Sequence, residues 1–281
     1  MDKKSDKLFS SAKIPWKNTK EEIWEDMSVR LEEGSTQFKV RRFLPGKQWL
    51  ALAASFTLLL AVAGFMHFYA VETSCPAGVH ATLELPDGSI AELNAETSVR
   101  YHPFWWFISR RVVLEGEAYF DVKKGKLFSV ISSKASTEVL GTSFNILARN
   151  EQYAVTCHSG MIRVTSSVTD HSITLEKRER ADMNEKGTFL ISTLTGERTE
   201  PGWMNNLIMF ASTPLRLVFN EIERQFGIII EAPEEMPYIY SGNFALDTSL
   251  ESVLTLLCRP FDLVYEQTSG NKYIIHPDPR D

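Results

Sequence analysis

The residues best suited to chemistry are three cysteines and six histidines. Cys157 and His158 are neighbours, and a thiol beside an imidazole is a combination that nucleophilic enzymes use. Their surroundings, YAVTCHSGMIRVTS, alternate as a β-strand does, and neighbours on a strand face opposite sides of the sheet. We therefore expect no catalytic role for this pair.

The remaining candidates are scattered along the chain. Cys75, Cys157 and Cys258 lie far apart, with no CxxC or Cys/His cluster of the kind that holds zinc. Their odd number leaves at least one thiol unpaired within the monomer. A dense disulfide framework is excluded, and a single bridge is left open. The other histidines considered are isolated from one another and from carboxylate motifs: His80, His102, His171 and His276. With no phosphate loop, HExxH or nucleophile elbow, the sequence predicts no catalytic residue, metal or cofactor.

Two groups of aromatic side chains suggest protein-binding surfaces instead of a catalytic site. The segment TKEEIWEDMSVRLEE, residues 19–33, predicts a helix that begins with a Thr19–Glu22 capping box. Apolar residues form a narrow stripe along it, and a tryptophan lies just upstream, so the expected contacts are Trp16, Ile23, Trp24, Met27 and Leu31. Residues 1–47 are too few to bury a sizeable core. The stripe is either a ligand for a groove on a cytoplasmic partner, or part of a linker that is disordered or lies on a membrane surface.

A second aromatic run, Phe104 to Phe107, contains Trp105 and Trp106. One reading is a loop folded over a β core. The other is a contact surface for another subunit or a receptor, with Arg110 and Arg111 as its rim.

Between these two groups lies QWLALAASFTLLLAVAGFMHFYAV, residues 48–71, which holds no charged residue. As a helix it would be about 36 Å long, enough to cross a hydrocarbon core of about 30 Å. A signal peptide would start nearer the N-terminus, and the residues before Cys75 are too polar for a lipidation box. We expect a single membrane span.

Charge predicts the direction of this span. Arg41, Arg42 and Lys47 precede it and Glu72 follows it, which favours a cytoplasmic N-terminus. Residues 1–47 carry a net charge of +3 and the remainder −9, which gives −6 overall. A net negative chain is a poor direct partner for nucleic acid. Because the N-terminus is expected to be cytoplasmic, the segment after residue 71 should be exported. In a bacterium with two membranes this means the periplasm.

The exported part should contain two folded modules. From 78 to 193 short runs rich in Val, Ile, Phe and Tyr alternate with turn residues, which predicts an all-β domain, either a sandwich, a barrel or a solenoid. From 203 to 277 the pattern reads β-α-β-β-α-β-β, a small α+β domain with its helices against one sheet. Pro214 should open its first helix, and Thr248 or Ser249 should cap its second.

Several ordered motifs resemble those of the FecR family of anti-sigma factors: LPDGSIAELNAETSVRYH, then RRVVLEGEAYFDV, LFSV and VLGTSFNI. The C-terminal stretches WMNNLIMFASTPLRLVFNEIERQFGIIIE and YSGNFALDTSLESVLTLL resemble the STN module, the N-terminal domain of secretins and TonB receptors. Within these motifs we expect Gly116 and Gly141 to serve the fold, and Tyr119 and Phe120 to face opposite sides.

The resemblance implies a one-pass signal transducer of the inner membrane. An outer-membrane TonB-dependent receptor would contact the exported part through its own N-terminal domain. The cytoplasmic segment, 1–47, would then release or activate an extracytoplasmic-function sigma factor, often after cleavage by an intramembrane protease. The first alternative is an anchored periplasmic binding or scaffold module with an inert tail. The second is an exported enzyme, which would require a buried cluster of titratable side chains.

Overall fold

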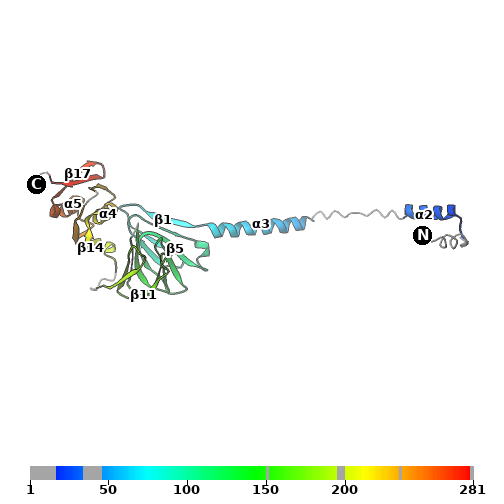
Figure 1. Cartoon of the computed structure of the whole chain (residues 1–281), viewed down its shortest axis with the longest axis horizontal. Helices are drawn as coiled ribbons and strands as arrows, with labels where there is room; N and C mark the ends of the chain where they lie inside the picture. Colours follow the sequence, from blue (N-terminus) through cyan, green and yellow to red (C-terminus); the bar gives the residue numbers. More distant parts are fainter. Residues whose placement is uncertain (1–16, 34–45, 150–151, 195–199, 234–235, 279–281) are drawn as a thin grey trace, which may run out of the picture. The chain divides into compact units, whose positions relative to one another are not determined.

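The computed structural model describes residues 17–33, 46–149, 152–194, 200–233 and 236–278. The chain divides into two compact units, Met1–Leu58 and Leu59–Asp281, and each is described by itself. Elements carry the labels of Figure 1.

The first unit contains the predicted amphipathic helix as α2, Lys20–Glu33. The capping box is formed in both directions. The Thr19 amide donates to the Glu22 carboxylate at 2.9 Å, and the Glu22 amide donates to Thr19 Oγ1 at 3.4 Å. These two bonds satisfy amides that a helix start leaves unpaired.

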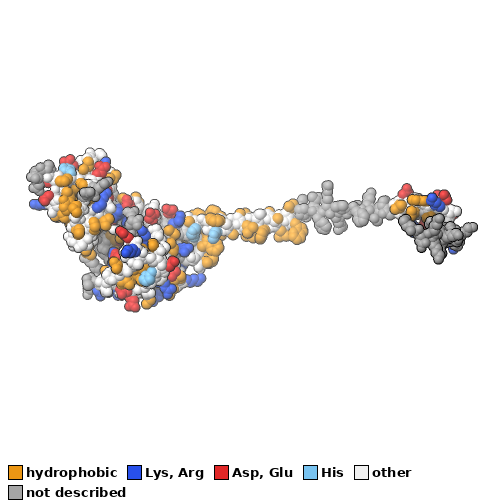
Figure 2. Space-filling view, viewed as in Figure 1, with side chains coloured by type: hydrophobic (Ala, Val, Ile, Leu, Met, Phe, Trp, Pro, Cys, Tyr) orange, Lys and Arg blue, Asp and Glu red, His pale blue; other side chains and the backbone are white. Residues whose placement is uncertain are grey.

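Helix α3, Lys47–Phe68, begins in the first unit and ends in the second. Its stretch from Gln48 to Phe68 has the length and apolarity of a membrane span, about 32 Å of helix. None of that stretch is buried inside the structure, and Figure 2 shows hydrophobic side chains along it. The hydroxyl of Thr57 donates to the Ala53 carbonyl at 2.6 Å, so this polar group is satisfied within the helix.

Helix α3 ends three residues before residue 71, the predicted end of the span. The helix ends at Phe68, and Val71 opens strand β1, Val71–Cys75, which pairs with β4. The uncharged sequence Tyr69–Val71 reads as a continuation of the apolar run, and only the pairing with a distant strand reveals the change. The β module therefore begins at β1 rather than at residue 78.

Thirteen strands make up the described part of this module. They are β1, β2 (Ala81–Glu84), β3 (Ile90–Leu93), β4 (Thr97–Tyr101), β5 (Arg110–Asp121), β6 (Phe128–Ile131), β7 (Ala135–Val139), β8 (Ser143–Arg149), β9 (Gln152–Cys157), β10 (Met161–Ser166), β11 (Ser172–Glu176), β12 (Glu179–Met183) and β13 (Phe189–Thr193). A 3-10 turn, η1, covers Pro103–Trp105 between β4 and β5.

Strand β5 belongs to two sheet halves at once. Its first part pairs with β4 and β6, and its second part pairs with β3 and β8. One half runs β1-β4-β5-β6-β7-β10-β11, and the other runs β2-β3-β5-β8-β9-β12-β13. Within the described part of this module, β5 and β6 are the only strands that pair in parallel.

Gly116 allows β5 to pass from one half to the other. Its φ is +118°, and an added Cβ would lie 2.6 Å from the Thr97 Cα. Only glycine permits both this backbone angle and this approach. The expected structural role of Gly116 is confirmed.

The core lies between the two halves, so the module is a two-layer sandwich. Phe120 of β5 packs against Phe128 of β6 across the layers, with ring centroids 6.0 Å apart. Thr137 of β7 and Tyr153 of β9 also meet across them, with 2.7 Å between their hydroxyl oxygens. Phe120 is fully buried while Tyr119 is half-buried on the other face, as the sequence predicts.

The C-terminal module has the predicted element order. It comprises η2 (Gly202–Asn205), β14 (Leu207–Pro214), α4 (Leu215–Phe226), β15 (Ile229–Glu231), β16 (Ile239–Ala245), α5 (Leu250–Cys258), η3 (Arg259–Phe261), β17 (Leu263–Ser269) and β18 (Lys272–Pro277). Its strands form two sheets rather than the one expected: β14-β16, and β15-β18-β17.

Local sequence explains both helices of this module. Pro214 precedes α4, and Ser249 caps α5 by accepting from the Ser252 amide at 3.3 Å. The apolar faces of α4 and α5 pack into a separate core that includes Phe219, Ile222 and Leu254. Figure 1 shows α4 and α5 together with β14 and β17 in this module.

Candidate functional site

The apolar stripe on α2 is exposed. Ile23, Trp24, Met27 and Leu31 keep 40%, 57%, 44% and 69% of their surface accessible. Helical spacing places them along one side, because residues three and four apart are neighbours on a helix. An exposed apolar stripe of this kind is a candidate contact surface. Trp16 lies outside the described residues.

The aromatic run does not form one surface. Trp106 is buried in the sandwich core, edge-on to Tyr101 and Phe128, with ring centroids 5.6 and 5.9 Å away. The prediction that Trp106 contacts a partner is wrong, because its ring fills the core beside the loop. Trp105 is half-buried, and its ring lies edge-on to His67 of α3 at 5.2 Å.

Arg110 is not a rim residue either. Its guanidinium is buried, forms an ion pair with Asp87 and donates to Ser89 Oγ at 3.2 Å. It also donates to the carbonyls of Lys123 and Lys126, at 3.1 and 2.8 Å.

Partial burial would raise the pKa of Asp87. Hydrogen bonds from Ser89 and the charge of Arg110 outweigh that effect and lower it. This network ties the β2–β3 turn to the start of β5, which is a structural role.

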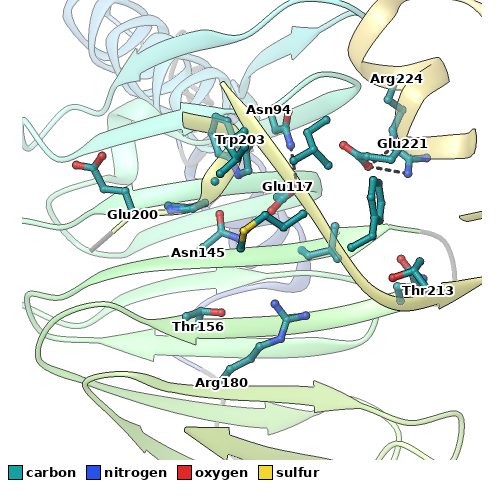
Figure 3. A pocket seen from close by; sticks show the side chains of 18 of the residues that line it. Asn94, Glu117, Asn145, Thr156, Arg180, Glu200, Trp203, Thr213, Glu221 and Arg224 are labelled. Carbon is teal, nitrogen blue, oxygen red and sulfur yellow. Dashed lines mark hydrogen bonds and ion pairs between the residues drawn. The ribbon is translucent and has the colours of Figure 1, made fainter. Parts of the chain in front are cut away.

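A cavity of about 710 Å³ lies between the sandwich and the C-terminal module (Figure 3). Strands β5, β8, β9 and β12 supply mainly polar side chains to it, and β14 supplies mainly apolar ones. Helix α4 supplies Leu217 and the charged pair Glu221 and Arg224. Its wall includes Asn94, Glu117, Asn145, Thr156, Arg180, Trp203, Ile208, Phe210, Leu217, Glu221 and Arg224. Its volume would suit a small ligand or a few side chains of a partner.

Glu117 anchors a polar network at this cavity. Its two carboxylate oxygens accept from Asn94 Nδ2 and Asn145 Nδ2, both at 2.8 Å. Burial, followed by the charge of Glu221, raises the pKa of Glu117, and this outweighs the stabilising hydrogen bonds. Figure 3 shows Glu117 beside Asn94 and Asn145.

The network continues into α4 and joins the two modules. Gln225 Nε2 donates to Asn94 Oδ1 at 2.7 Å and to Glu221 Oε1 at 2.8 Å. Gln225 Oε1 lies 3.0 Å from His80 Nε2. Arg224 pairs with Glu221 at 2.8 Å. Each carboxylate is thus held by neighbouring side chains, an arrangement that suits docking of the modules better than proton transfer to a substrate.

This network was not predicted from the sequence. Glu117 alternates with buried residues along β5, so its place in the sequence predicts a side chain that points away from the core. Gln225 occupies a buried position on α4. A polar residue within an otherwise apolar helix face was the available signal, since buried amides require partners. Two partners of Gln225, Asn94 and His80, lie more than 100 positions away, so the sequence could not supply them.

The cysteines are free and buried. Cys157 lies in the sandwich core, where burial raises the pKa of its thiol to about 11. The negative charge of Glu179 also raises this pKa. The His158 ring packs edge-on to Tyr119 at 5.6 Å. A thiol with a raised pKa remains protonated at neutral pH and is a poor nucleophile. Among the described residues, no group of three or more His, Cys, Asp or Glu side chains could hold a metal ion.

These observations define a class of protein. An apolar helix of membrane-spanning length leads into a β-sandwich, and a small α+β module docks on that sandwich across a polar network and a cavity.

Comparison with known proteins gives the family. Residues 70–163 match the model for FecR protein, and residues 207–275 match the model for the FecR C-terminal domain. Together the two matches cover more than half of the chain, in the expected order, and the chain belongs to the FecR family. The second match assigns the C-terminal module to the FecR C-terminal domain, in place of the STN module that the sequence suggested.

Solved structures agree with this assignment. Two crystal structures from Parabacteroides distasonis, at 1.65 and 2.50 Å resolution, contain a protein described provisionally as an anti-sigma factor. Each is 27% identical to this chain with a TM-score of 0.66, over 74% of this chain and 99% of the other. No curated protein sequence matches the chain.

Proposed function

We propose that this protein is a single-pass membrane anti-sigma factor. The observation that carries the proposal is the order of parts. A helix with an exposed apolar stripe, an apolar helix of membrane-spanning length and two FecR modules follow one another. The structural relative described as an anti-sigma factor supports the same role. The role is regulatory rather than catalytic.

On the inner side of the membrane, residues 1–47 would bind an extracytoplasmic-function sigma factor. The basic residues before α3 favour this orientation, and the exposed stripe on α2 provides the contact. Trp24 is the expected centre of the interface, because tryptophan often dominates binding energy. Trp16 would add a second anchor.

On the outer side, the sandwich and the C-terminal module would lie in the periplasm. The N-terminal domain of an outer-membrane TonB-dependent receptor is the proposed source of the signal. Cleavage by an intramembrane protease is the proposed way in which the signal releases the inner segment. The division at 1–47, 48–71, 78–193 and 203–277 stays a proposal, with the strand pairing of β1 favouring a start near residue 71 for the first exported domain.

The first test is capture of the sigma factor by the full chain in detergent. Trp24→Ala combined with Met27→Ala should weaken capture by about 100-fold, since two anchor truncations cost about 3 kcal/mol or more. Val29→Ala is the matched control, because Val29 is 50% exposed and lies on the opposite side of α2. Equal losses in both variants would mean that the stripe is not the interface.

A scaffold function is the second candidate, and the cavity of about 710 Å³ favours it. In that case the inner segment would be inert. Deleting residues 1–40 separates the two functions, because transcription of the target genes should change only if the segment acts on a sigma factor.

A further inference from the structure

The loop between β4 and β5 packs against the end of the apolar helix α3. The Tyr69 carbonyl lies 3.0 Å from His102 Nδ1, and the Tyr69 ring lies 5.4 Å from that of Phe104. Within the last turn of α3, His67 meets Trp105 edge-on at 5.2 Å. The loop is therefore fixed at the point where the helix ends.

This loop presents apolar side chains to the outside. Phe107 is 69% exposed, Ile108 57% and Phe104 39%. They are held rather than loose, because Trp106 is buried between them and the Ile108 amide donates to the Trp105 carbonyl at 3.0 Å. A fixed cluster of exposed aromatic and aliphatic groups indicates a contact surface.

The turn between β5 and β6 adds positive charge beside the loop. Lys123, Lys124 and Lys126 are exposed, and Lys126 Nζ donates to the Phe107 carbonyl at 3.1 Å. Leu127 is 49% exposed next to them. Loop and turn together line a hollow of about 600 Å³. This basic group stands out because the chain after α3 is acidic overall.

We propose that the loop 102–109 and the turn 123–127 form a membrane-contact patch. Phe104, Phe107 and Ile108 would lie among the headgroups of the leaflet that α3 leaves, and the three lysines would face anionic lipid phosphates. The inference rests on the proposed membrane span, and it adds a second contact between the protein and the same bilayer.

Three features favour a bilayer as the occupant. The patch is continuous with the exposed end of α3, where Phe68 is 80% and Tyr69 42% exposed. Aromatic side chains concentrate at membrane interfaces, where an apolar body and a polar edge are both accommodated. Clustered lysines next to a span are drawn to anionic lipid.

The test uses the full chain in vesicles of phosphatidylcholine with about one-third phosphatidylglycerol. Phe107→Cys carries an environment-sensitive fluorophore, and Leu190→Cys of β13, 65% exposed in the native chain, is the matched control. The native cysteines are all buried, so labelling should be specific. Spin-labelled lipids should quench the probe at 107 several-fold more than the probe at 190. Equal quenching would overturn the proposal.

A second measurement tests the charge. In the Phe107→Cys background, replacing Lys123, Lys124 and Lys126 by Glu should lower quenching in the mixed vesicles to the level found in pure phosphatidylcholine. These lysines are exposed, so the fold should survive the changes. Quenching that is insensitive to both lipid charge and lysine charge would contradict the role of the turn.

Carbonate extraction of the same vesicles separates this inference from the proposed span. Extraction of the protein would refute the span and the patch together. A retained protein with an unquenched probe at 107 would refute the patch alone. Shielding of that probe only after a receptor domain is added would assign the surface to a protein and overturn the membrane proposal.

Discussion

The Arg110 guanidinium is held by four acceptors, and among these only Asp87 carries charge. In sequence Arg110 was one of two adjacent basic residues beside an aromatic run, which suggested a surface rim. Its burial depends on a turn some twenty residues earlier, so the sequence alone could not reveal it. Trp106 was misread for the same reason, since four consecutive aromatic residues do not show which of them enters the core.

Removing Asp87 tests this account. Asp87→Ala should lower the free energy of unfolding by about 3 kcal/mol, because the buried Arg110 charge would lose its counter-ion. Chemical unfolding of the full chain in detergent measures the change. Asp182→Ala is the control, since its pair with Arg180 is partly exposed, unlike the buried Arg110 guanidinium, and should contribute less than about 1 kcal/mol. Similar losses in both variants would contradict the structural role of Arg110.

At the scale of elements, the sequence predicted most helices and strands, because their signals are local. The Thr19–Glu22 capping box, Pro214 before α4 and Ser249 before α5 are each confirmed. Long-range pairing was not predictable. Val71, the first residue of strand β1, was assigned to the span, and the strands of the C-terminal module divide into two sheets rather than one.

The passage of β5 between the sheet halves gives a prediction at this scale. Gly116→Ala should lower the free energy of unfolding by about 3 kcal/mol or more, because it combines a positive φ with a clash against Thr97. Gly270→Ala is the control, with φ +53° but open space around it, and should cost only about 1 kcal/mol. Urea unfolding compares the two, and a smaller loss at 116 than at 270 would count against the crossover.

At the scale of the whole molecule, the modules meet through ionisable and amide side chains. The sequence predicted both modules but not their contact, since Asn94 and Gln225 are brought together only by the fold. Glu117 makes this contact sensitive to pH. Its pKa is raised in the folded chain, so the folded state binds a proton more tightly than the unfolded state does.

Stability from Glu117 is therefore present below its unfolded pKa, near 4.3, and is lost as pH rises through the raised folded pKa. Glu117→Gln should remove this part of the pH dependence. Asn145 can accommodate the new amide, because its Oδ1 lacks a hydrogen-bond partner in the described part of the chain.

Urea midpoints between pH 4 and 8 measure the effect, with Glu115→Gln, exposed on the same strand, as control. An unchanged slope in Glu117→Gln would show that Glu117 does not titrate as described.

The short distance between α3 and β1 has a mechanical consequence. Only two residues separate Phe68 from Val71, and β1 is bound to a single neighbour, β4. A force that pulls on α3 along its axis would act directly on β1. Three residues past the end of β1, the Gly78 amide donates at 2.7 Å to the Arg224 carbonyl of α4. A force applied to α3 would therefore reach helix α4, which carries Glu221 and Gln225. Few residues outside helices and strands lie between these points to extend under that force.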